Sequence, residues 1–233
     1  MTVLERVPPD YVSATVKATT YNGKTASCVL TIQKPAFTAV DLGLPSGKKW
    51  ANMNIGATTP HEVGYYIAWG ETNKKSSGQQ YEWSNYKYGT GQTALTKYNS
   101  TDQIQVLELS DDAARYLKSS PWRTPTVAEW QELFNYNYTN WEWVTRSYLG
   151  FSVSGYLVTS KANGNWIFLP ATGYKYGSGN VANGDQGMYM TSNVERYGVY
   201  PYAYASYFSL TSSEQLKRTW IRCNGLAIRA IQD

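Results

Sequence analysis

Residues 122–134 read WRTPTVAEWQELF and predict both the start and the buried face of a helix. Thr126 is followed three residues later by Glu129, the capping-box pattern in which the two side chains satisfy backbone N–H groups of the first turn. Pro125 fixes its own φ just before this N-cap. The apolar residues recur at helical spacing: Val127, Trp130, Leu133 and Phe134. We therefore expect a helix over residues 126–135 with an apolar face.

A second helix is expected over residues 111–118, DDAARYLK, with Ser110 as its N-cap. Acidic residues open this segment and a lysine closes it, which suits the helix dipole. The later sequence consists of short β-type runs between Gly, Asn and Ser turns: 155–160, 165–170, 187–192, 202–210 and 226–231. Two early helices followed by many short strands predict an α+β fold.

The first part of the chain predicts a β-hairpin. Residues 11–33 alternate in β-rich runs around Asn22-Gly23, a strong hairpin signal. Pro35 and the small residues after it suggest a linker, so the expected domains are residues 1–34 and 35–233. Residues 22–28, NGKTASC, resemble the end of a bacterial Ig-like domain of group 2, and this resemblance implies that Cys28 is a small buried side chain.

Composition excludes several classes of protein. Aromatic residues make up 15% of the 233 residues and charged residues 16%, a balance that argues against disorder. No apolar stretch approaches the roughly 20 residues of a membrane helix, so we expect no membrane insertion. The net charge is +4 and the basic pairs are scattered. Because nucleic-acid binding usually needs a concentrated basic stripe, we expect no nucleic-acid partner.

The sequence offers few residues for catalysis or metal binding. Two cysteines and one histidine cannot form a zinc site of the Cys/His type. His61 lies in a loop-like run and is expected to be a solvated residue. A carboxylate pair for glycoside hydrolysis could come from four residues, but their spacing selects no two of them: Glu71, Glu82, Asp185 and Glu195. We therefore expect no enzymatic activity, no cofactor and no metal.

Five motifs carry a resemblance to a known family. They are residues 40–51 (VDLGLPSGKKWA, continued by NIGATTP at 54–60), 68–72 (AWGET), 122–130, 167–174 (IFLPATGY) and 222–229 (RCNGLAIR). In this order they resemble the major paralogous domain family named after Fibrobacter, which is abundant in Bacteroides-type surface proteins. The motif tryptophans are expected in the core: Trp50, Trp69, Trp122 and Trp130. Arg229 is expected to have a structural role.

The resemblance implies a fold and a class of function. The family is similar to the branch of the C-type lectin fold that includes the formylglycine-generating enzyme, and the same fold carries the variable proteins of diversity-generating retroelements. The expected function is therefore non-catalytic ligand binding at a bacterial cell surface or outside the cell, by a fixed lectin-like adhesin or by a retroelement-diversified receptor. The ligand would be a glycan or a surface protein. The alternative is a structural or tip component of a surface appendage.

A tyrosine-rich segment near the end of the chain is the expected binding surface. Tyr, Ser, Gly and Asn dominate antibody-like paratopes, and Trp and Arg are typical hot-spot residues. Period two in the strand at 203–210 places Tyr204 in the core and Tyr207 outside. Cys223 stands where the family often has Tyr, so it is expected to be exposed and unpaired. The expected contact residues are Met188, Asn193, Arg196, Tyr197, Tyr200, Tyr202, Tyr207, Arg218 and Trp220.

Overall fold

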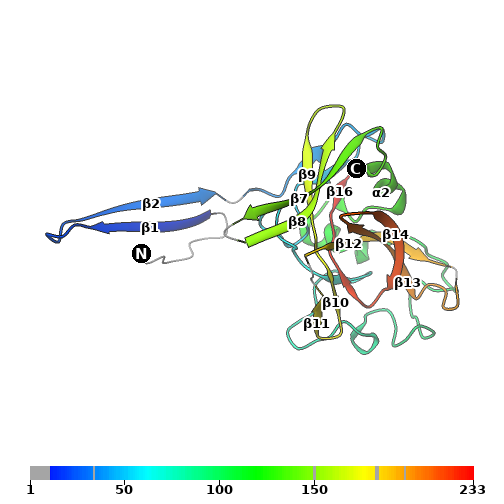
Figure 1. Cartoon of the computed structure of the whole chain (residues 1–233). Coiled ribbons are helices and arrows are strands. Elements are labelled where there is room, and N and C mark those ends of the chain that lie inside the picture. Colours follow the sequence, from blue (N-terminus) through cyan, green and yellow to red (C-terminus); the bar gives the residue numbers. More distant parts are fainter. Residues whose placement is uncertain (1–10, 34, 149–150, 182–183, 197) are drawn as a thin grey trace. The chain divides into compact units, whose positions relative to one another are not determined.

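The computed structural model shows a mostly β protein, with 40% strand and 9% helix (Figure 1). It describes residues 11–33, 35–148, 151–181, 184–196 and 198–233. The chain forms two units, Met1–Phe37 and Thr38–Asp233. The first contains β1 (Tyr11–Thr19) and β2 (Thr25–Gln33).

The second unit contains fourteen strands, two α-helices and two 3-10 turns in the described residues. The strands are β3 (Ala39–Asp41), β4 (Lys49–Ala51), β5 (Ile67–Ala68), β6 (Trp122–Arg123), β7 (Thr139–Tyr148), β8 (Phe151–Ser160), β9 (Trp166–Pro170), β10 (Tyr174–Tyr176), β11 (Gly179–Val181), β12 (Gln186–Glu195), β13 (Tyr204–Thr211), β14 (Gln215–Ile221), β15 (Gly225–Leu226) and β16 (Ile231–Gln232). The helical elements are η1 (Trp83–Asn85), η2 (Leu109–Asp111), α1 (Ala113–Lys118) and α2 (Val127–Leu133).

The expected α+β, C-type-lectin-like fold is wrong. The chain forms five small antiparallel sheets, and both α-helices are only six and seven residues long. A helix of this length has about two turns or fewer, so it can cover only a small part of a sheet. None of the described helices is long and apolar enough to cross a membrane.

The two expected helices do form, but both are shorter than predicted. At α2 the capping box is present: the Thr126 hydroxyl accepts from Glu129 N, and the Glu129 side chain accepts from Thr126 N. At α1 the expected cap is wrong, because Asp112 rather than Ser110 is the N-cap. The Asp112 carboxylate accepts from the backbone N–H groups of Ala114 at 2.8 Å and Arg115 at 3.2 Å.

The N-terminal hairpin pairs β1 with β2 in register from Tyr11↔Gln33 to Thr19↔Thr25. All side chains over residues 15–29 are exposed within this unit. The expectation that Cys28 is buried is therefore wrong, because two strands alone have no second layer to cover either face.

Four sheets build the second unit, with strand orders β3-β4-β16-β6, β7-β8-β9, β11-β10-β15-β5 and β12-β13-β14. In two of these sheets one of the two interior strands comes from near the end of the chain. β16 lies between β4 and β6, and β15 lies between β10 and β5. The last residues of the chain therefore join strands that form much earlier in the sequence.

Trp130 of α2 is at the centre of the main core, as the apolar pattern predicts. Its ring is fully buried and lies 4.8 Å from Trp50, 5.5 Å from Tyr189 and 5.6 Å from Phe208, measured between ring centroids. One short helix thus contributes the side chain that contacts β4, β12 and β13. The other motif tryptophans, Trp69 and Trp122, are also buried, as expected.

Every residue from 222 to 231 is buried, including two arginines. The Arg229 guanidinium donates to Asn54 Oδ1 at 2.8 Å, to Ala51 O at 3.0 Å and to Phe168 O at 2.6 Å. The Arg222 guanidinium donates to four backbone carbonyls, from Tyr88, Lys97, Tyr98 and Tyr202. Because burying a charge without hydrogen bonds is very costly, these acceptors must be in place for the segment to fold inside the protein.

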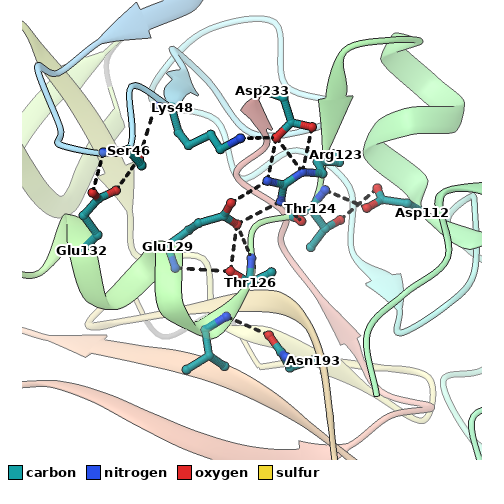
Figure 2. Close-up of polar contacts among 11 residues, drawn as sticks. Ser46, Lys48, Asp112, Arg123, Thr124, Thr126, Glu129, Glu132, Asn193 and Asp233 are labelled. Atoms are coloured by element: carbon teal, nitrogen blue, oxygen red, sulfur yellow. Dashed lines mark hydrogen bonds and ion pairs between the residues drawn. The ribbon is translucent and has the colours of Figure 1, made fainter. Parts of the chain in front are cut away.

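Arg123 connects the start of α2 to the end of the chain (Figure 2). Its guanidinium donates to Glu129 Oε2 at 2.9 Å and to Asp233 Oδ1 at 2.8 Å. Lys48 Nζ also donates to Asp233 Oδ1, at 2.7 Å. The same Glu129 that caps α2 thus orients Arg123, which in turn holds the residue after β16.

The Arg229→Met variant tests the buried guanidinium. We expect the free energy of unfolding to fall by about 3 kcal/mol or more, because three buried acceptors lose their donor. Chemical denaturation measures this. The exposed Arg218→Met variant is the control and should change stability by no more than about 0.5 kcal/mol. Equal losses in the two variants would contradict the role of Arg229.

The Asp233 carboxylate should stabilise the fold in a pH-dependent manner. Arg123, followed by Lys48, lowers its pKa to about 2 from 3.8. A carboxylate whose pKa is lower in the folded state stabilises above the unfolded pKa, and this contribution disappears as pH falls through the folded pKa. Asp233→Asn should therefore reduce unfolding free energy near neutral pH, by on the order of 0.5–1 kcal/mol for a half-exposed group. The two proteins should converge near pH 2, and a constant difference would contradict this account.

Candidate functional site

Three of the nine expected contact residues are buried, which corrects the expectation that they form an exposed surface. They are Met188, Tyr202 and Tyr207. Tyr207 lies on β13, whose other face contributes Phe208 to the core. The second face is also covered, because Trp220 lies 6.3 Å from the Tyr207 ring and Tyr174 lies 5.4 Å from Trp220.

Met188 and Tyr202 are buried by contacts from distant segments. Met188 N donates to Thr172 Oγ1 at 2.9 Å, which draws β12 against the start of β10. The carbonyl of Tyr202 accepts from the buried Arg222 at 3.0 Å. The backbone of Tyr202 also adopts a positive φ of 66°. Tyr202 therefore belongs to the set of acceptors that holds Arg222.

Asn193 also has a structural contact. Its side-chain oxygen accepts from Val127 N at 2.8 Å, at the first residue of α2 (Figure 2). Backbone N–H groups in the first helical turn have no partner within the helix, so Asn193 satisfies one of them from β12. This contact links the sheet to the helix and gives Asn193 a positioning role.

The remaining expected residues differ in exposure. Arg196, Tyr200 and Arg218 are exposed, while Trp220 is partly buried. Arg218 forms an ion pair with Glu214 at 3.3 Å. Tyr197 lies outside the described residues. The expected set is therefore divided between the interior and the surface.

Two further expectations concern Cys223 and His61. Cys223 is unpaired, as expected, but it is buried rather than exposed, and burial raises the pKa of its thiol to about 12. A thiol in this state is a poor nucleophile.

His61 is partly buried, with its ring centroid 5.2 Å from that of Phe168, so the expectation of a solvated side chain is wrong. Burial, and secondarily the charge of Arg146, lowers the pKa of His61.

A hollow of about 610 Å³ on the second unit is lined by tyrosines and lysines. We call it the lysine–tyrosine hollow, and its ring and ammonium groups come from Tyr65, Tyr66, Tyr81, Lys74, Lys75 and Lys175. The turn at residues 76–79 completes the lining. Pockets of about 300–1,000 Å³ are typical of small-ligand sites, so its size suits a ligand of a few rings.

Strands β5, β10 and β15 place these side chains together. Lys175 of β10 pairs with Gly225 of β15, which pairs in turn with Ala68 of β5. Tyr81 N donates to Gly177 O at 2.9 Å, which ties the loop before η1 to the β10–β11 hairpin. The ring of Tyr81 packs on Gly225, where a Cβ would lie only 2.5 Å from it.

Hydrogen bonds to the backbone fix two of the tyrosine rings. The Tyr66 hydroxyl donates to Thr172 O, and the Tyr81 hydroxyl donates to Tyr66 O at 2.5 Å. Burial raises the pKa of both hydroxyls, that of Tyr81 to about 12. Both tyrosines are therefore neutral donors at physiological pH, and their rings offer a fixed lining.

One of the three lysines forms an ion pair with a carboxylate, and the other two lie over tyrosine rings. Lys75 Nζ lies 2.6 Å from Glu71 Oε1, and this ion pair is nearly buried. Lys74 Nζ lies 4.8 Å from the Tyr65 ring centroid, and Lys175 Nζ lies 5.6 Å from that of Tyr66. A cation–π contact contributes about 0.5–1 kcal/mol at an exposed site. These ammonium groups are thus positioned by weak contacts.

Sequence reasoning did not identify this site, although its signals are visible. Tyr65-Tyr66 and Lys74-Lys75 are doublets, and Ser76-Ser77-Gly78 follows as a turn. The lysine pair is one of several scattered along the chain, and the tyrosines occur in a chain that contains 21. Only the pairing of β10 with β15 brings Lys175 to the other members.

Comparison with models of known families, with curated proteins and with solved structures finds no match. Within the part of the chain that the structure describes, no group of three or more His, Cys, Asp or Glu side chains is placed to hold a metal ion. The site is therefore interpreted from its own geometry.

The Gly225→Ala variant tests how the hollow is built. The added methyl group would collide with the Tyr81 ring, so we expect a loss of about 1–3 kcal/mol in unfolding free energy. Gly91→Ala is the matched control, because nothing lies within 4 Å of the added Cβ. Its stability should change by less than about 1 kcal/mol. Equal stability of the two variants in chemical denaturation would contradict the packing of Tyr81 on Gly225.

Proposed function

We propose that the protein is a non-catalytic ligand-binding protein of the bacterial cell surface or extracellular space, and that it binds a glycan in the lysine–tyrosine hollow. The observation that carries this proposal is the gathering of three tyrosines and three lysines around one hollow of about 610 Å³. A pyranose presents an apolar C–H face that packs on aromatic rings, and its hydroxyls accept hydrogen bonds from ammonium groups.

Structural contacts made by several of the nucleophile and base candidates support binding rather than catalysis. The Cys223 thiol is buried with a raised pKa, and His61 packs against Phe168. Glu71 lies in an ion pair with Lys75 and Glu195 in one with Lys217. Each of these groups is occupied by a structural contact, whereas the partly exposed Tyr65 and two lysines, Lys74 and Lys175, line a space that a ligand can enter.

The exposed hairpin favours a second candidate function, a structural component of a surface appendage. Over residues 15–29 both faces of β1 and β2 are uncovered within their own unit. A two-stranded hairpin is marginally stable by itself, so a joint with another polypeptide would stabilise it. Retroelement diversification is a separate proposal about residues 188–223, and a near-identical repeat beside the coding sequence would support it.

Glycan binding can be tested with a tyrosine of the hollow. The chain is screened on an array of bacterial and host glycans, and affinity for the best glycan is then measured by titration calorimetry. Tyr65→Ala should weaken binding by roughly tenfold, about 1.4 kcal/mol, because it removes a ring of the lining.

The control is Tyr116→Ala, which removes an exposed tyrosine on α1 away from the hollow lining. Its affinity should match the parent protein. Thermal melting of both variants shows whether a loss of binding comes from unfolding. Absence of any bound glycan, or equal affinity of the folded Tyr65→Ala variant, would overturn the proposed site.

A further inference from the structure

The positive charge of the lysine–tyrosine hollow has no matching negative charge in its lining. Of the described residues that line the hollow, none is Asp or Glu. Lys75 has a carboxylate partner, Glu71, from beneath the lining. Lys74 and Lys175 have no ion-pair partner among the described residues and lie over the rings of Tyr65 and Tyr66. The hollow therefore presents two ammonium groups that are not neutralised.

Many other cations of the second unit are already paired with carboxylates. Such pairs hold Lys48, Lys87, Lys97, Arg123, Lys217 and Arg218. Arg222 and Arg229 are buried among oxygen acceptors. Lys49 is a further cation without an ion pair among the described residues, but it does not line the hollow. The two uncompensated ammonium groups of the hollow thus form a local pair, which differs from the continuous basic groove along which a nucleic-acid backbone lies.

The contacts that hold Lys74 and Lys175 are also easily replaced. A cation–π contact of this kind is weaker than a charge-assisted hydrogen bond to an anionic oxygen. Both side chains are long and flexible, so each ammonium can turn from its ring to an anion inside the hollow. This movement would uncover the partly exposed ring of Tyr65 for the apolar side of a sugar, while Tyr66 and Tyr81 are buried and form the base of the lining.

We infer that the ligand of the hollow is an anionic saccharide, whose carboxylate or sulfate group binds Lys74 and Lys175 while its ring packs on Tyr65. This inference rests on the proposed function and specifies the class of glycan. Carboxylated and sulfated sugars share the required chemistry, a pyranose that carries an anionic oxygen group. The size of the hollow, about 610 Å³, admits a sugar ring together with such a group.

The test compares probes of different charge by titration calorimetry on the full chain. The probes are a heparin-derived tetrasaccharide for sulfate, a tetragalacturonate for carboxylate, and a neutral galacto-tetrasaccharide. We expect one or both anionic probes to bind at least about tenfold more tightly than the neutral one. Raising the salt from about 0.05 M to about 0.5 M should weaken the anionic binding, because exposed charges are then screened.

The variant Lys74→Gln/Lys175→Gln should reduce the affinity for the anionic probe by at least about tenfold, with thermal melting unchanged. Lys49→Gln is the matched control, because Lys49 is exposed on β4, has no ion pair among the described residues and does not line the hollow. Its affinity should equal that of the parent protein.

The possible failures are distinguishable. If the neutral probe binds as tightly as the anionic probes and depends on Tyr65, the anionic inference is overturned and the proposed function stands. If no saccharide binds, both are overturned. Tighter binding of a single-stranded oligothymidylate than of either anionic sugar, with loss in the double lysine variant, would overturn the saccharide in favour of a nucleic acid.

Discussion

The burial of residues 222–231 is the constraint on which the rest of the second unit depends. A segment inside a protein must satisfy its backbone groups as well as its side chains. Its carbonyls accept from Trp69 N, Met190 N, Ile55 N and Ala51 N at 2.8–2.9 Å, so three distant segments are attached to it. The guanidinium groups of Arg222 and Arg229 add acceptors from further segments.

The position of the lysine–tyrosine hollow follows from the same segment. Gly225 lies between β10 and β5, so the lysine of β10 and the tyrosines that precede β5 come to the same region. The absence of a side chain at Gly225 allows the Tyr81 ring to pack against the strand. A core segment thus supports a surface site, and its small residue is as important to the hollow as the residues of the lining.

Local sequence patterns were sufficient to predict several helices and strands. The capping box and apolar spacing predicted α2, and the Asn22-Gly23 turn predicted the pairing of β1 with β2. Other elements lacked a decisive local signal. β7 pairs with β8 over ten positions, but its sequence, TNWEWVTRSY, marks a strand mainly through Trp141 and Trp143. Both predicted helices form, yet their sequence patterns could not show how small a fraction of the fold is helical.

The burial of three expected contact residues could not be predicted from the sequence. The alternation along β13 correctly places Phe208 and Leu210 on the core face, but Tyr204, expected in the core, is only partly buried and lies outside the core cluster. The alternation also cannot tell whether the second face is covered, and Tyr174 and Trp220 cover Tyr207. The tyrosines and lysines of the hollow are all visible in the sequence, although about a hundred residues separate Lys175 from Lys74. Composition and local patterning determined the β-rich hairpin, the capping box of α2 and the apolar core residues of that helix, because these depend on neighbours in the chain. The tertiary structure alone decided which polar and aromatic side chains meet at a site, because that depends on strand pairing between distant segments.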